Sequence, residues 1–348
     1  MSPPDLTTSI DRYEAALRAH FGTAFRLDDL DLKHDKMRKS AFLFLRATCW
    51  RWAECAAALC PDLMGAPLAA SVGDAHAANF GLWRDAQFRL VWGINDYDEA
   101  ARLPYALDLV RLCASILVAD DGLDAGQLAD TLLDSYRKAL MTPQPIVLEG
   151  DRLWLRALFE ATNDDRIRYW NKLRDAQPAP VEPPEFEALL LAALPGDLSD
   201  RKIAPRTAGA GGLGRPRFAA SGIYRGGPVA VEIKGVMPSC WAAGREAGLA
   251  QRMATGQNRS PDPTLVYGAG HAVRRLSPND RKLDFDEINK SHRNKLVVAM
   301  AAELAAVHAA DADVHTIRRH LRRQPEDWLA DAAQTVADWT VKEWRGYR

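Results

Sequence analysis

The middle of the chain differs in composition from both of its ends. From about residue 200 to residue 280, glycine turns separate short β-branched segments, as in "SGIYRGGPVAVEIKGV". This pattern predicts antiparallel strands. The segments on either side carry apolar residues at helical spacings. We therefore expect an α+β fold, with a small antiparallel β lobe over a larger, mainly helical lobe that both ends of the chain build.

This division gives three parts. Residues 1–199 would form a helical lobe that holds the polar motifs described below, 200–280 the β-rich lobe, and 281–348 helices that return to the larger lobe. Apolar residues run almost continuously through 36–60 and predict a mostly buried helix there. Four prolines in 178–184 indicate a stiff surface connector near the first boundary.

Composition and charge narrow the possible partners. The 348 residues include 45 basic and 46 acidic ones, which nearly cancel, so no global field draws the chain toward nucleic acid. No apolar run in the sequence approaches the roughly 20 residues that a membrane span requires. The first residues also lack the charged-then-apolar pattern of a signal segment. We expect a cytoplasmic protein that binds neither nucleic acid nor membrane.

Two short motifs gather polar side chains. They are "GDAHAANFG", residues 73–81, and "NDYDEA", residues 95–100. The second follows "FRLVWGI", residues 88–94, whose aromatic and β-branched residues predict a strand. That strand would deliver the second motif at its end.

Four of these side chains offer oxygen donors: Asp74, Asn79, Asp96 and Asp98. Carboxylate and amide oxygens suit Mg²⁺, which commonly completes its shell with phosphate oxygens. A carboxylate that does not bind the metal could orient or deprotonate an attacking hydroxyl. The alternative is turn chemistry, because Asp, Asn and Gly are favoured in loops for their own backbone hydrogen bonds. Two such motifs in tandem favour the first interpretation.

A glycine-rich stretch, "GAGGLG", opens the β-rich part. Gly209, Gly211 and Gly214 have GxGxxG spacing, with Gly212 between them. A dinucleotide-binding motif would need a helix after the glycines, whereas strands follow here. A β-hairpin lid over phosphates fits better, since glycines let backbone N–H groups approach phosphate oxygens. A glycine-rich hairpin without a ligand is the alternative.

A lysine follows on a later predicted strand. Alternation in "GPVAVEIKGV" puts Val229, Val231 and Ile233 on one face and Lys234 on the other. From that face an ammonium could reach phosphates beneath the lid. Glu246, in "GREAGLAQRM", is either a partner for Lys234 or a solvent-facing helical residue.

Together the motifs carry a resemblance. "GDAHAANFG" with "INDYDEA" resembles the GDxHxxN catalytic loop and metal-binding aspartate of aminoglycoside phosphotransferases and other protein-kinase-like enzymes, and "GAGGLG" with "VEIK" resembles their phosphate loop and strand lysine. Kinases place the glycine loop first, whereas here it comes last. That order, with "RKSAFLFLRA", "YALDLVRLCAS", "VRRLSP" and "LAAVHA", resembles the bacterial family called domain of unknown function 2252 over about residues 35–310. The implied fold is two-lobed, protein-kinase-like and circularly permuted.

The resemblance implies a role for each motif residue. Asp74 would position or deprotonate the acceptor hydroxyl, and His76 would shape the loop by hydrogen bonding or share in the chemistry. Asn79, Asp96 and Asp98 would bind Mg²⁺. The ATP phosphates would be covered and held by Gly209, Gly211, Gly212, Gly214 and Lys234, with Glu246 holding the lysine.

The expected function is ATP- and Mg²⁺-dependent phosphotransfer to an unidentified hydroxyl or amine acceptor, either a small molecule or a protein. Two features depart from the kinase pattern: Glu232 stands where kinases usually have a small residue near the adenine, and Arg215 and Arg217 follow the glycines. One alternative is a nucleotide-binding regulatory or nucleotidyl-transferring protein. Another is a metallophosphoesterase, although the remaining histidines do not form the clusters that such a site needs.

Overall fold

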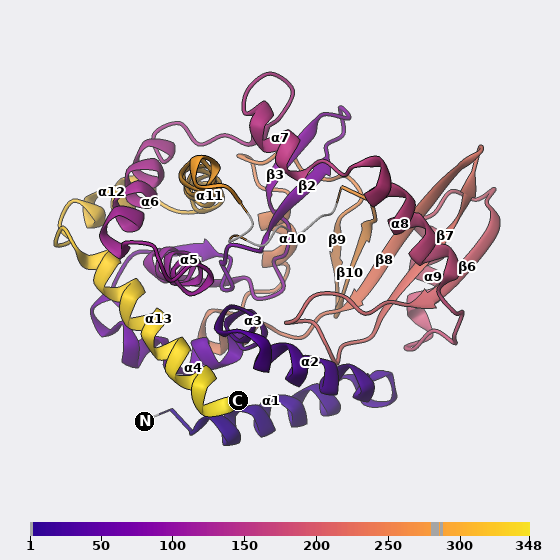
Figure 1. Ribbon diagram of the computed structural model, residues 1–348, viewed down its shortest axis with the longest axis horizontal. Helices are drawn as coiled ribbons and strands as arrows, with labels where there is room; N and C mark the ends of the chain where they lie inside the picture. The colour runs from indigo at the N-terminus through magenta and orange to yellow at the C-terminus, as the bar shows by residue number, and fades with distance from the viewer. Residues whose placement is uncertain (1–2, 280–284, 286–287) are drawn as a thin grey trace.

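The computed structural model describes residues 3–279, 285 and 288–348 (Figure 1). Its helices are α1 (Leu6–Phe21), α2 (Leu27–Lys39), α3 (Ala41–Ala47), α4 (Cys49–Leu59), α5 (Tyr105–Ala119), α6 (Ala125–Ala139), α7 (Leu153–Phe159), α8 (Asn163–Asp175), α9 (Glu185–Ala192), α10 (Leu249–Ala254), α11 (Lys290–Ala309), α12 (Val314–Leu321) and α13 (Trp328–Tyr347). Its strands are β1 (Leu68–Ser71), β2 (Phe80–Arg84), β3 (Leu90–Ile94), β4 (Ala101–Pro104), β5 (Ile146–Val147), β6 (Ser199–Pro205), β7 (Arg217–Tyr224), β8 (Gly227–Gly235), β9 (Val266–Gly268) and β10 (His271–Arg275). None of the described helices is long and apolar enough to span a membrane. The predicted boundary at residue 280 lies outside the described residues.

Five strands form one antiparallel sheet in the order β6-β7-β8-β10-β9. The alternation predicted for β8 is confirmed, because Val231 and Ile233 pack into an apolar cluster with Phe186 and Leu190 of α9. Lys234 therefore lies on the opposite face. Helices α8 and α9, which precede the sheet in the chain, contact β7, and α9 also contacts β8.

Helices from both ends of the chain build the larger part of the molecule. Helix α5 is buried along most of its length and packs against α13, while α6 packs against α11. Figure 1 shows these C-terminal helices, in orange and yellow, next to the purple and magenta α5 and α6. Two small antiparallel sheets, β1-β4 and β2-β3-β5, accompany them. The fold is α+β, as predicted.

The single helix predicted for residues 36–60 is wrong. The chain forms parts of three helices there, α2, α3 and α4, which break at Ser40 and Thr48. Ser40 has an extended backbone, and its hydroxyl accepts a hydrogen bond from the Leu43 amide, as an N-cap does. The Thr48 hydroxyl donates to the Phe44 carbonyl at 2.7 Å. Side-chain bonds to the backbone thus compete with a continuous helix, and apolar periodicity does not reveal this competition.

Candidate functional site

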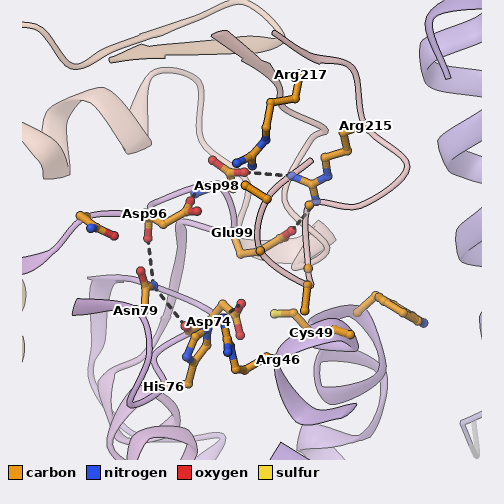
Figure 2. A pocket seen from close by; sticks show the side chains of 18 of the residues that line it. Arg46, Cys49, Asp74, His76, Asn79, Asp96, Asp98, Glu99, Arg215 and Arg217 are labelled. Carbon is orange, nitrogen blue, oxygen red and sulfur yellow. Dashed lines mark hydrogen bonds and ion pairs between the residues drawn. The ribbon is translucent and has the colours of Figure 1, made fainter. Parts of the chain in front are cut away.

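One cavity of about 240 Å³ brings the predicted motifs together. Figure 2 shows side chains from well-separated segments facing it. Its walls include Asp74, His76 and Asn79 from the loop after β1; Asn95, Asp96, Asp98 and Glu99 from the segment after β3; Gly209, Gly211 and Gly212 from the loop between β6 and β7; and Arg46 and Cys49 from α3 and α4. The structure therefore places the glycine-rich stretch beside the two polar motifs, although more than 100 residues separate them in the sequence.

Asp74 is held through one of its two carboxylate oxygens. Arg111 of α5 donates to Oδ1 from Nε at 2.8 Å and from Nη2 at 2.5 Å. The other oxygen, Oδ2, lies 3.7 Å from Nε2 of His76. Burial raises the pKa of Asp74, and the Arg111 guanidinium opposes that shift. This arrangement leaves Oδ2 as the oxygen that can accept a proton from a ligand.

Asp108, also on α5, fixes the backbone that leads into Asp74. Its carboxylate accepts hydrogen bonds from the amides of Val72 at 2.6 Å and Gly73 at 3.0 Å. Nε2 of His308, on α11, lies 3.1 Å from the same carboxylate. Gly73 has a φ of 75°, and a Cβ there would lie 2.1 Å from a backbone oxygen, so the turn requires glycine. Arg111 and Asp108 were not predicted as site residues.

Asn79 is oriented by backbone carbonyls. Its amide nitrogen donates to the carbonyls of Asp74 at 3.3 Å and Asp96 at 3.1 Å (Figure 2). Because both amide hydrogens are engaged, the side-chain oxygen is the atom available to a cation. His76 is buried, and its Nδ1 accepts a hydrogen bond from the Ala78 amide at 3.2 Å. This contact matches a histidine that shapes the loop.

A buried ion pair fixes the end of β3, just before Asp96. Glu303 of α11 accepts a hydrogen bond from the Ile94 amide at 3.1 Å, and Arg259 donates to the Ile94 carbonyl at 2.7 Å. Arg259 and Glu303 also pair with each other. The strand predicted within residues 88–94 is confirmed as β3. Neither member of the ion pair was predicted.

Asp96 and Asp98 share the ammonium of Lys234. Nζ lies 2.9 Å from Oδ2 of Asp96 and 2.8 Å from Oδ1 of Asp98. Burial would raise the pKa of Asp96, but the Lys234 charge and hydrogen bonds from Asp98 and Lys234 outweigh it and lower that pKa. Burial and the Asp96 charge raise the pKa of Asp98. Strand β8 thus brings its lysine directly to the predicted metal ligands.

These donors suit a hard cation whose protein shell is incomplete. Asp96, Asp98 and the amide oxygen of Asn79 are of the type that Mg²⁺ prefers. Across residues 3–279, 285 and 288–348, no group of three or more His, Cys, Asp or Glu side chains is placed to hold a metal ion. A cation at this site would therefore need ligand or water oxygens to complete its coordination.

Arg215 enters the acidic side of the cavity from the end of the glycine-rich stretch. It donates to Oδ2 of Asp98 at 2.9 Å and to Oε1 of Glu99 at 3.2 Å (Figure 2). Its side chain is only 7% exposed. The sequence left two roles open for Arg215, contact with phosphate or with water. The structure shows that it is largely buried and pairs with Asp98 and Glu99.

The glycine loop, residues 208–214, is held from outside by α2. Lys36 donates to the Gly209 carbonyl at 2.7 Å, and Nζ of Lys33 lies 3.5 Å from the Gly211 carbonyl. The loop joins β6 to β7 and so forms the turn of a hairpin, as predicted. The role of α2 in holding it was not predicted.

The expected pairing of Glu246 with Lys234 is corrected by the structure. Glu246 pairs with Arg102 at 2.6 Å and also with Arg252, and its side chain is 37% exposed. It precedes α10, which begins at Leu249, and therefore lies on no helix that could hold it beneath the sheet. Asp96 and Asp98 take its place as partners of the lysine.

Part of the chain matches a known protein family. Residues 27–173 match the model of domain of unknown function 2252. That family is described as an uncharacterized protein conserved in bacteria, and the match supports the resemblance over this range. The matched segment includes Asp74, Asn79 and Asp96, whereas the glycine loop and Lys234 lie beyond it. Neither the curated proteins nor the solved structures contain a match to the chain.

Proposed function

We propose that this chain is an ATP- and Mg²⁺-dependent phosphotransferase that acts on a hydroxyl or amine acceptor, with the lobes of a circularly permuted kinase-like fold. One observation carries the proposal. Asp74, Asn79 and Asp96 line the same cavity as the glycine loop, and Lys234 touches Asp96. An acceptor-activating carboxylate, cation donors and a phosphate-binding segment are the parts that phosphoryl transfer requires.

The connectivity of the β lobe supports the same proposal. The glycine loop joins β6 to β7, and Lys234 lies on the next strand, β8. Kinases also place a glycine loop ahead of the strand that carries their phosphate-contacting lysine. In this chain the unit follows the catalytic motif instead of preceding it. A circular permutation changes the order of units and leaves their contacts in place.

Each residue has a distinct task in the proposed reaction. Oδ2 of Asp74 would accept the proton of the acceptor, while Arg111 fixes the other oxygen. Asp96, Asp98 and the oxygen of Asn79 would hold Mg²⁺, which when bound neutralises phosphate charge. Lys234 would donate to the phosphates from its position beside Asp96.

The deciding experiment separates chemistry from binding. Asp74→Asn retains the side-chain size and an oxygen for Arg111 but removes the base, so turnover should fall by about 10²-fold or more while nucleotide affinity stays nearly unchanged. Transfer from labelled ATP with Mg²⁺ and a metabolite extract measures turnover, and calorimetry measures affinity. Asp85→Asn is the matched control, because Asp85 is a buried carboxylate that pairs with Arg89 on the β2–β3 hairpin, outside the cavity.

Two outcomes would contradict the proposal. If Asp74→Asn lost affinity as steeply as turnover, Asp74 would be a metal ligand rather than a base. If the wild type bound ATP tightly but transferred nothing, and the variant behaved identically, a regulatory nucleotide-binding protein would fit better. Thermal unfolding of both variants excludes loss of structure as the cause.

Nucleotidyl transfer is the second candidate, and the position of Glu232 favours it. Glu232 is buried, but the arginines that contact it line the cavity. Their charges near the expected adenine position would disfavour the usual placement of the base, and we propose that a different placement presents a different phosphate to the acceptor. ATP labelled at the α-phosphate or at the γ-phosphate distinguishes the two reactions, because only one label enters the product.

A further inference from the structure

The face of the β sheet that turns toward the cavity is charged. Glu232 and Lys234 lie on the same face of β8 because they are two residues apart. Arg217 of β7 is the register partner of Lys234, and Arg274 of β10 is the register partner of Glu232. Directly opposed residues of neighbouring strands share a face. The strands therefore place both arginines beside the two residues of β8.

Glu232 stands at the centre of an arginine cluster formed by Arg206, Arg217 and Arg274. Nη1 of Arg217 lies 3.5 Å from Oε2, Nη2 of Arg274 lies 3.2 Å from Oε1, and Arg206 also contacts Oε2. Burial would raise the pKa of Glu232, but the three guanidinium groups outweigh it and hold that pKa well below its usual range. The carboxylate is therefore ionised, and the three guanidinium groups share it.

The arginine cluster faces the cavity. All three arginines line it, whereas Glu232 lies behind them with a side chain that is 1% exposed. Three guanidinium groups gathered in a partly buried place repel one another unless anions compensate them. Because the three groups share Glu232 and line the cavity together, they offer N–H donors to an anion that enters it.

A phosphate group fits this surface better than a nucleobase does. Guanidinium groups bind phosphate through paired, charge-assisted hydrogen bonds, whereas a neutral base stacks on apolar or aromatic groups. The cluster is also distinct from the acidic side of the cavity, where Asp96 and Asp98 are paired with Lys234. The cavity thus offers an anion site in addition to its cation donors.

We propose that Arg206, Arg217 and Arg274 form a phosphate-binding subsite. Its ligand is either the phosphate chain of the nucleotide or a phosphate on the acceptor, and only this choice rests on the phosphotransferase function proposed above. Glu232 is the internal anion with which this ligand would compete for the three guanidinium groups.

Binding of inorganic tripolyphosphate, measured by calorimetry with EDTA and without acceptor, tests the subsite. Arg206→Gln and Arg274→Gln should each weaken binding by about tenfold, the usual effect of losing one charge-assisted contact. Glu232→Gln should tighten binding, because it removes the competing anion. Arg156→Gln should change nothing, because Arg156 pairs with Glu149 and Glu160 away from the cavity.

Wild-type-like affinity in the folded arginine variants would overturn the subsite, and so would weaker binding by folded Glu232→Gln. Glu232→Gln is expected to change the affinity in the opposite direction from the arginine variants, so the proposal remains testable if an arginine variant unfolds. If ATP competes with tripolyphosphate, and competes less well in Arg206→Gln, the phosphate belongs to the nucleotide. If ATP and tripolyphosphate bind at the same time, the phosphate belongs to the acceptor. Neither assay requires turnover, so a failure of the Asp74 test leaves this result standing.

Discussion

At the scale of single residues, one ammonium organises the acidic side of the cavity. Lys234 contacts both Asp96 and Asp98, and Arg215 contacts Asp98 from the other side. A divalent cation that uses these carboxylates must therefore compete with Lys234 for their oxygens. Because of this competition, cation binding depends more strongly on Asp96 being fully charged. Asp96 is the carboxylate of the two whose pKa is lowered.

Removing that charge gives the first prediction. Asp96→Ala should abolish Mg²⁺-dependent nucleotide binding, because the metal loses a charged ligand, whereas His76→Ala should weaken binding less, because His76 mainly shapes the loop. Titration of each variant with Mg²⁺ at fixed nucleotide measures both effects. Small losses of equal size in the two variants would count against the metal assignment.

The residues that bear the proposed chemistry could be predicted, and those that position them could not. Asp74, Asn79 and Asp96 stand in short motifs whose residue types suit phosphate chemistry. Arg111 reaches Asp74 from a helix 37 positions further along the chain. Its one sequence signal is a charge within the apolar run "YALDLVRLCAS", where an unpaired arginine would be costly to bury.

At the scale of elements, helix α2 carries a buried lysine, Lys33, whose surroundings shift its pKa. Lys33 lies 4.3 Å and 4.6 Å from the ring centroids of Tyr13 and Trp50. Burial, with a contribution from the Arg215 charge, lowers the pKa of Lys33 to about 7. The aromatic rings act in the opposite direction, because their faces attract a cation.

The lowered pKa predicts a pH dependence of stability. Between about pH 7 and the ordinary lysine pKa of roughly 10.4, the unfolded chain binds the proton that folded Lys33 has released, so stability should rise with pH by up to about 1.4 kcal/mol per unit. Lys33→Met should lack this component. Urea unfolding of both proteins at pH 6 to 9 (roughly the range that spans the folded pKa) gives the difference.

A difference that does not vary with pH would mean that the rings of Tyr13 and Trp50 keep Lys33 charged. The pH range below the folded pKa of Lys33 provides an internal check. Below the folded pKa, Lys33 is protonated in both states, so the contribution of Lys33 to the slope should vanish there.

The elements themselves were partly predictable. Strand β8 follows from its two-residue alternation, because one of its faces packs against α9. The breaks at Ser40 and Thr48 were not predicted, because a hydroxyl that caps or bonds a helix turn does not disturb the apolar pattern.

At the scale of the whole molecule, one arginine joins the two ends of the chain. Arg51 of α4 donates to the Pro4 carbonyl at 2.7 Å and to Glu343 of α13 at 2.9 Å. Figure 1 shows the two termini on the same side of the molecule. The side chain of Arg51 is 5% exposed, so its bonds are shielded from water.

Loss of this arginine should destabilise the fold. Arg51→Met leaves Glu343 partly buried without its partner, and the free energy of unfolding should fall by about 3 kcal/mol. Arg168→Met is the control, because Arg168 forms an exposed pair with Asp165 and its loss should cost less than about 1 kcal/mol. Urea unfolding measures both. Equal small effects would show that the contact between the two ends contributes little.

The composition of the middle segment predicts the strands of the five-stranded sheet, but the packing of the helices against one another cannot be predicted from local sequence pattern. The contacts of α13 with α5 and of α11 with α6 join segments more than 150 residues apart. The sequence pattern of each of these helices indicates only that the helix has an apolar side. Which sides meet depends on the complete set of helices.

The hydrogen bonds from α2 to the glycine loop have a consequence for the thermodynamics of ligand binding. A free glycine segment gives up about 1 to 2 kcal/mol of backbone entropy per residue when it becomes ordered. In this protein the bonds from Lys36 and Lys33 have already ordered the loop during folding. A ligand that enters the cavity therefore meets a preorganised surface, and its binding should carry a small entropic penalty.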